Sequence, residues 1–195
     1  MKQVTGIVLA GGKSSRMGQN KALMPYAGVT LIEHITGRLK PYCQSVMVSV
    51  REKAPFEYLG LPLLEDHKND CGPLAGIEAA LSASSTDLCF IVPCDLPLFS
   101  GAIVPLLMAE IGDADACVPV LNNYYEPLVA LYAKSVLPEI DRALAEKRYK
   151  VKDIFANITV KQITEDYFIT RKLEHIFENL NTFTEYNKIL QVQQL

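Results

Sequence analysis

Short apolar segments rich in β-branched residues alternate with segments of helical periodicity along most of this chain. Strands are expected over 4–9, 46–50, 61–64, 88–92, 116–120, 128–132 and 159–163. Helix starts are expected at the capping box Thr30-Leu31-Ile32-Glu33, at Pro73, Ser100 and Ser135, and at a second capping box over 182–185. This alternation favours an α/β fold in which helices cover both faces of a mostly parallel sheet.

Length and composition favour a single domain over residues 1–195, because 49% hydrophobic residues suffice for a sizeable core. No apolar run approaches the roughly 20 residues of a membrane span, and the N-terminus lacks the pattern of a signal peptide, so we expect no membrane association. A net charge of −3 argues against a nucleic acid partner. The odd number of cysteines, with no C-x-x-C pair, predicts reduced, mostly buried thiols in a cytoplasmic protein: Cys43, Cys71, Cys89, Cys94 and Cys117.

The first expected strand runs directly into the loop LAGGKSSRMGQNKAL. Gly11 and Gly12 would let backbone N–H groups approach an anion closely, and Lys13, Arg16 and Lys21 add positive charge. The spacing is not that of a P-loop, because Lys13 follows a second glycine and the register differs by one residue. From these residues alone, a phosphate-binding loop and a solvated turn are both open interpretations.

Carboxylates follow two further expected strands. Asp66 comes after 61–64, and Asp95 stands in Pro93-Cys94-Asp95-Leu96-Pro97 after 88–92. An Asp on such a stiff turn suits Mg²⁺, which takes one or two carboxylates together with phosphate oxygens. Gly72 precedes a helix start, where N–H groups can meet a ligand. Since ligands of parallel sheets bind beyond the carboxyl ends of the strands, these residues predict one nucleoside triphosphate site.

Five segments, LAGGKSSRMGQNKAL, EDHKNDCGPLAGI, PCDLP, YYEPLVALY and NLNT, occur in the order found in molybdenum cofactor guanylyltransferases, and the chain resembles that family from Gly6 to about Tyr186. The resemblance implies a Rossmann-like three-layer fold and transfer of GMP from GTP to molybdopterin with release of pyrophosphate. It also leaves room for transient contact with a molybdoenzyme or a cofactor-delivery protein.

The resemblance further implies roles for individual residues. The backbone of Leu9, Ala10 and Gly11, with Gly12 beside them, would contact the nucleotide. Lys21 and Arg16 would hold its phosphates, Asp66 would bind the base or ribose, and Asp95 would bind both GTP and Mg²⁺. Asn181 would complete the metal site. The family often has Asn at a position that contacts the nucleotide, and this chain has Ser49 there. Gly72 is also expected to lie near the nucleotide.

The resemblance implies in-line attack of a molybdopterin phosphate oxygen on the α-phosphorus of GTP. Because this nucleophile is already an anion, Arg16, Lys21 and Asp95 would act by positioning and by neutralising charge. His34, His67 and His175 need no catalytic role. The basic, aromatic segment 146–155 could meet the pterin, or could be a solvated helix end.

Two alternatives remain open at this point. The first is another nucleotidyltransferase, such as a molybdopterin cytidylyltransferase or a sugar-phosphate enzyme, although the pair Gly11-Gly12 favours the guanylyl branch. The second is a catalytically silent nucleotide-binding module.

Overall fold

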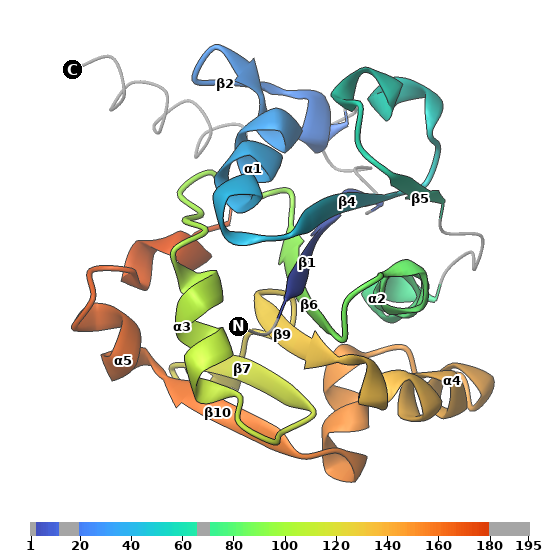
Figure 1. Ribbon diagram of the computed structural model, residues 1–195, viewed down its shortest axis with the longest axis vertical. Coiled ribbons are helices and arrows are strands. Elements are labelled where there is room, and N and C mark those ends of the chain that lie inside the picture. Colours follow the sequence, from blue (N-terminus) through green and yellow to red (C-terminus); the bar gives the residue numbers. More distant parts are fainter. Residues whose placement is uncertain (1–2, 12–19, 66–70, 180–195) are drawn as a thin grey trace.

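A computed structural model describes residues 3–11, 20–65 and 71–179 of the chain. They form an eight-stranded sheet in the order β10-β7-β9-β6-β1-β4-β5, with β8 paired to β7 (Figure 1). The strands are β1 (Val4–Leu9), β4 (Ser45–Val50), β5 (Leu63–Glu65), β6 (Leu88–Pro93), β7 (Ala116–Leu121), β8 (Tyr124–Tyr125), β9 (Ala130–Ala133) and β10 (Val160–Thr164). A separate small hairpin pairs β2 (Pro25–Tyr26) with β3 (Val29–Thr30).

The described helices connect these strands. The α-helices are α1 (Leu31–Leu39), α2 (Gly72–Ala83), α3 (Ile103–Glu110), α4 (Leu137–Ala145) and α5 (Glu165–Ile169). Short 3₁₀ helices are η1 (Lys21–Leu23), η2 (Lys40–Tyr42), η3 (Ala54–Leu59), η4 (Lys134–Val136), η5 (Val151–Asn157) and η6 (Glu174–Phe177). None of the described helices is long and apolar enough to cross a bilayer.

The sheet is mostly parallel, as predicted. β5, β4, β1 and β6 run parallel to one another, and β10 runs parallel to β7. β9 is inserted antiparallel between β6 and β7. The sequence pattern predicted this strand over 128–132 but gave no direction for it, and the ladder begins only at Ala130 because the chain turns through 126–129.

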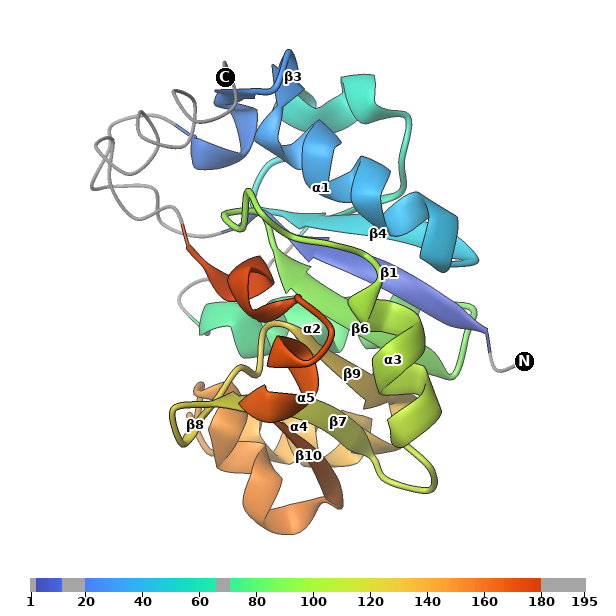
Figure 2. The ribbon, with the colours of Figure 1, turned by 90° about the vertical axis from the view of Figure 1, so that its left-hand side faces the viewer.

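Helices pack on both faces of the sheet, which confirms the predicted three-layer arrangement (Figures 1 and 2). α1, α3 and α5 cover one face and α2 and α4 cover the other. The strands alternate accordingly: Val8 and Val92 belong to the core on the α1 side, whereas Ile7 and Ile91 belong to the core on the α2 side. Apolar side chains therefore point both ways from central strands, which is why these strands read as continuous apolar runs.

The predicted capping box at the start of α1 is confirmed. The backbone N–H of Thr30 donates to Glu33 Oε2 at 2.7 Å, and the N–H of Glu33 donates to Thr30 Oγ1 at 3.4 Å. The expected cap at Ser100 is wrong, because the residue preceding α3 is Ala102, whose N–H reaches Ser100 Oγ at 3.4 Å.

The helix expected to open at Ser135 begins instead at Leu137, after η4. The hydroxyl of Ser135 donates to Asp115 Oδ1 rather than capping the helix. The last predicted helix, from 182, lies outside the described residues.

Candidate active site at the carboxyl edge of the sheet

Four parallel strands end side by side at one edge of the sheet. Leu9, the last residue of β1, pairs with Ser49 of β4 and with Pro93 of β6. Ser49 in turn pairs with Leu64 of β5. The loops that follow these strands therefore start next to one another. Most of the predicted site residues belong to these loops.

The loop after β1 is fastened to both neighbouring strands. The N–H of Ala10 donates to the carbonyl of Ser49 at 2.8 Å, and the N–H of Cys94 donates to the carbonyl of Leu9 at 3.1 Å. A Cβ placed on Gly11 would come no closer than 3.8 Å to another residue, at the backbone of Arg51. Packing among the described residues therefore does not require glycine at position 11.

The charge of Lys21 acts on Asp95 across this edge. Asp95 lies in the turn after β6, and burial raises the pKa of its carboxyl group while the positive charge of Lys21 lowers it. Lys21 opens η1, where the side chain of Asn20 accepts the N–H of Ala22 at 3.1 Å and the buried Ala22 anchors the segment. The structure thus brings together the predicted phosphate-binding lysine and the predicted metal carboxylate.

The turn that carries Asp95 is braced by α1. The ring Nε2–H of His34 donates to the carbonyl of Pro97 at 3.1 Å, and the same ring packs edge-to-face on Tyr26 with centroids 4.7 Å apart. Leu96 is buried, and its carbonyl accepts the N–H of Phe99. His34 therefore has a structural place beside the site, as expected for a residue of the first helix, and its lack of a catalytic role stays a prediction.

Ser49 lies below the surface of the site. Its side chain is 3% exposed, and a Cβ on Gly76 of α2 would come within 3.0 Å of its Oγ and 3.5 Å of a methyl group of Leu9. Glycine at position 76 thus lets α2 approach β4 and β1 closely. A nucleotide contact by Ser49 stays a prediction, and the visible role of this residue is to hold Ala10 through its carbonyl.

The start of α2 meets the segment 146–155, for which the sequence leaves both pterin contact and a solvated helix end open. Gly72 has φ +65°, which favours glycine, and a Cβ there would lie 3.5 Å from the carbonyl oxygen of Tyr149. Desolvation and the neighbouring Cys71 thiol raise the pKa of Tyr149. The segment 146–155, far away in the sequence, therefore borders the predicted nucleotide loops.

Arg148, one of the basic residues of this segment, is bound by other residues of the protein. Arg148 pairs with Glu146 at 2.8 Å and with Glu139 at 3.5 Å, and donates to the carbonyl of Asp153 at 3.1 Å. These contacts fix the chain after α4. They leave the neighbouring Tyr149, rather than Arg148, as the residue of this segment that meets the start of α2.

Several predicted site residues lie outside the described part of the chain: Gly12, Arg16, Asp66 and Asn181. Their roles stay predictions. Glu65, at the end of β5, is the last described residue before Asp66.

One carboxylate at this edge received no role from the sequence patterns. Glu126 precedes β9, is half-buried, and burial raises the pKa of its carboxyl group. The sequence marks the pair Glu126-Pro127 directly before an expected strand, and this pair lies in the segment YYEPLVALY of the family resemblance.

The thiol of Cys94, next to Asp95, is a poor nucleophile. Burial raises the pKa of Cys94 to about 12. All five cysteines are free. Among the described residues no group of three or more His, Cys, Asp or Glu side chains could hold a metal ion, so a metal at Asp95 would need ligands from a bound substrate or from residues such as Asn181. That donor chemistry fits Mg²⁺.

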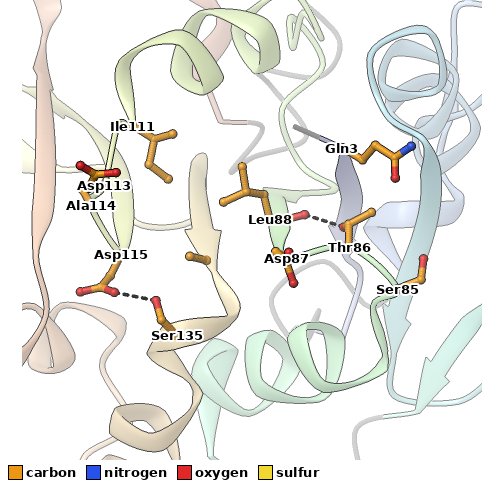
Figure 3. Close-up of a pocket in the computed structure, with 12 residues that line it drawn as sticks. Gln3, Ser85, Thr86, Asp87, Leu88, Ile111, Asp113, Ala114, Asp115 and Ser135 are labelled. Atoms are coloured by element: carbon orange, nitrogen blue, oxygen red, sulfur yellow. Dashed lines mark hydrogen bonds between the residues drawn. The ribbon is translucent and has the colours of Figure 1, made fainter. Parts of the chain in front are cut away.

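A hollow of about 550 Å³ lies at the opposite edge of the sheet (Figure 3). Its lining includes Asp87, directly before β6, and Asp115, directly before β7. Asp115 accepts hydrogen bonds from the Ser135 hydroxyl at 2.5 Å and from the N–H of Thr159 at 2.9 Å. The hollow is therefore separated from Asp95 by the length of the strands, and at least this carboxylate has a structural use.

Comparison with known proteins gives consistent matches over the chain. Residues 6–162 match the family model described as a MobA-like NTP transferase domain. A protein of Carboxydothermus hydrogenoformans named "Probable molybdenum cofactor guanylyltransferase" is 36% identical over 196 residues, covering 100% of this chain and 99% of the relative. A protein of the same name from Pelotomaculum thermopropionicum is 33% identical, covering 93% of this chain and 89% of the relative. A crystal structure of molybdopterin-guanine dinucleotide biosynthesis protein A from Archaeoglobus fulgidus superposes with a TM-score of 0.83 at 25% identity, covering 97% of this chain and 98% of that chain.

Proposed function

Because the chain belongs to the family of MobA-like NTP transferases, we propose that it transfers GMP from GTP to molybdopterin, forming the guanine dinucleotide and releasing pyrophosphate. The observation that carries this proposal is the meeting of Lys21, Asp95 and the backbone of 9–11 at one sheet edge, in a chain with full-length similarity to named guanylyltransferases. We further propose that residues 1–195 act as one catalytic domain in the cytoplasm.

The glycine loop is suited to receive the nucleotide. Leu9 and Ala10 are held at the strand end by hydrogen bonds to β6 and β4. The space next to Gly11 would allow a ligand to approach the backbone closely. Gly12 and Ser49 are the further nucleotide contacts that we propose in this part of the edge, with Asp66 and Gly72 on the β5 side.

Lys21 and Asp95 have different electrostatic roles in this proposal. Lys21 would neutralise charge on the phosphates of GTP, assisted by Arg16, and it also favours the ionised form of Asp95 against the effect of burial. The attacking phosphate oxygen of molybdopterin is an anion, so no side chain has to remove a proton from it. The protein's contribution is then to align the two substrates and to neutralise the charge of the leaving pyrophosphate.

Asp95 would hold a magnesium ion, with Asn181 as the second protein ligand. A magnesium ion, when bound, neutralises phosphate charge and orients phosphate oxygens. The half-buried position of Asp95 beside a strand end suits this role, because a carboxylate on a braced turn can be held in one geometry.

The experiment that tests the proposal offers the purified protein each of the four nucleoside triphosphates with Mg²⁺ and molybdopterin. We expect guanine dinucleotide and pyrophosphate in equal amounts, with GTP preferred by about 100-fold or more, since wrong bases leave buried acceptors unpaired. Preference for CTP would replace the proposal with a cytidylyltransferase. Nucleotide binding without any dinucleotide would indicate a silent binding module.

A further inference from the structure

The carboxylate of Glu126 differs from the other half-buried acidic groups because no residue in the described part of the chain binds it. Within residues 3–11, 20–65 and 71–179, no hydrogen bond or ion pair reaches this half-buried group, and burial alone accounts for its raised pKa. Glu139, a buried carboxylate of the same fold, shows the contrast, because it is bound by Arg142, Arg148 and Asn157. Desolvating a carboxylate without a partner is costly, so Glu126 is poorly explained as a structural residue.

The backbone around Glu126 is held firmly in place. Its N–H donates to the carbonyl of Pro119 at 2.8 Å, and its own carbonyl accepts the N–H of Val129 at 3.1 Å. The next residue, Pro127, accepts a 2.7 Å hydrogen bond from the hydroxyl of Tyr132, whose ring is fully buried. The chain therefore presents the carboxylate from a preorganised turn, which is the arrangement expected of a ligand-binding group.

The position of Glu126 in the sheet separates it from the predicted nucleotide residues. β9, which follows Glu126, neighbours β6 on the side away from β1. The loops proposed to hold GTP leave β1, β4 and β5, on the other side of the Asp95 turn. The acceptor substrate must reach the same phosphates without occupying the base site, so the β9 side is the available half of this edge.

Aromatic rings border the same region. Tyr125, directly before Glu126, packs edge-to-face on Phe155 with ring centroids 5.1 Å apart, and its hydroxyl accepts a hydrogen bond from Gln162 at 2.6 Å. Phe155 is the last residue of the segment 146–155, for which pterin contact is one of two open interpretations. These rings supply apolar surface at the turn that carries Glu126, and a flat heterocycle can pack on such surface.

We propose that Glu126 is a specificity-determining residue that binds the pterin ring of the acceptor substrate, accepting hydrogen bonds from its N3–H and 2-amino groups. A carboxylate has two acceptor oxygens whose spacing matches two adjacent N–H donors of a 2-amino-4-oxopyrimidine. Such bonds would supply the partner that the carboxylate lacks among the described residues. This inference rests on the proposed function, since it takes the acceptor to be molybdopterin.

The test compares two probes that differ only at the 2-position of the ring. They are 6-hydroxymethylpterin monophosphate, with a 2-amino group, and 6-hydroxymethyllumazine monophosphate, with a 2-oxo group. Dissociation constants are measured by fluorescence titration for the wild-type protein and for Glu126→Gln. The exposed Glu57→Gln serves as the matched control.

The wild-type protein and the Glu57→Gln control should bind the pterin more tightly than the lumazine. Glu126→Gln should weaken pterin binding by about 10- to 100-fold, the range for lost hydrogen bonds to a charged group. The same variant should bind the lumazine more tightly than the wild type does, because the Gln amide can donate to the 2-oxo group. A structural defect would weaken both probes and leave their ratio unchanged, and that outcome would overturn the proposal.

A second pair of ligands separates this inference from the proposed function. The ratio of dissociation constants for GTP and ITP, which lacks the 2-amino group of guanine, should be the same in wild type and Glu126→Gln. A change confined to this ratio would place Glu126 at the nucleotide base instead. The wild-type protein could make no dinucleotide while Glu126→Gln still weakens pterin binding and strengthens lumazine binding. In that case the proposed function fails and the pterin-binding role of Glu126 stands.

Discussion

The backbone N–H of Cys94 donates a 3.1 Å hydrogen bond to the carbonyl of Leu9. This bond continues the pairing of Leu9 with Pro93 beyond the end of the sheet ladder. It ties the turn that carries Asp95 to the start of the glycine loop. The two parts of the candidate active site are therefore positioned by one ladder of backbone hydrogen bonds, and side-chain changes at Asp95 should leave the fold intact.

Asp95→Asn should abolish turnover while the protein stays folded. The substitution keeps the shape of the side chain but removes the charge proposed to hold the metal, which should cost about 100-fold or more in rate. Pyrophosphate release measures the rate, and circular dichroism with urea unfolding checks the fold. A folded variant with a rate near that of wild type would refute the metal-binding role of Asp95.

Lys21→Ala should weaken GTP binding by about 10- to 100-fold, the range for a charge-assisted hydrogen bond. Guanosine, which lacks phosphates, should bind the variant and the wild type equally. Calorimetric titration of both ligands checks this, with the exposed Lys53→Ala as the matched control. Equal losses for GTP and guanosine would show that Lys21 does not contact phosphate, and Arg16→Ala can be judged by the same comparison.

His34 should make the stability of the protein depend on pH. Burial, and next the charge of Arg38, lower the pKa of His34 below its ordinary value of 6.5, against the opposing effect of its bond to Pro97. The unfolded chain therefore takes up the proton first as the pH falls, so stability is present above pH 6.5 and is lost progressively below it. In urea unfolding, His34→Gln should lose less stability than wild type between about pH 8 and pH 5.5. Parallel losses in the two proteins would contradict this account of His34.

Two glycines near α1 should respond to alanine in opposite ways. A Cβ on Gly101 would collide with the carbonyl oxygen of Arg38 and the ring of Tyr42, whereas a Cβ on Gly37 would meet nothing within 4 Å. Gly101→Ala should destabilise the protein by about 2 kcal/mol or more. Gly37→Ala, in an exposed helix position, should stabilise it by about 0.5–1 kcal/mol. Urea unfolding of both variants measures the two signs, and a neutral Gly101→Ala would mean that the loop before α3 can move away.

Local patterns predicted the elements that depend on neighbours in sequence. The capping box at Thr30 and the apolar run of β1 are specified by adjacent residues, and both were found as predicted. The placement of β9 between β6 and β7 depends on pairings between distant segments, such as Ile91 with Ala130, and no local pattern encodes them.

The same distinction holds at the candidate site. The position of Asp95 at this edge could be predicted because a polar residue between prolines follows a buried strand, and its role stays a prediction. The contact of Gly72 with Tyr149, and the burial of Glu126 without a partner among the described residues, arise only when remote segments pack together. The start of α3 was misplaced for a different reason, since Ser100 uses its hydroxyl one turn before the helix begins.

The most direct test of the central claim follows the phosphates of GTP through the reaction. The wild-type protein is incubated with Mg²⁺, molybdopterin and GTP carrying ³²P at either the α- or the γ-phosphate. The proposed transfer of GMP predicts that the α label enters the pterin dinucleotide and that the γ label leaves as pyrophosphate, in equal amounts. Release of the γ label as free phosphate, with the α label left in GDP, would contradict it.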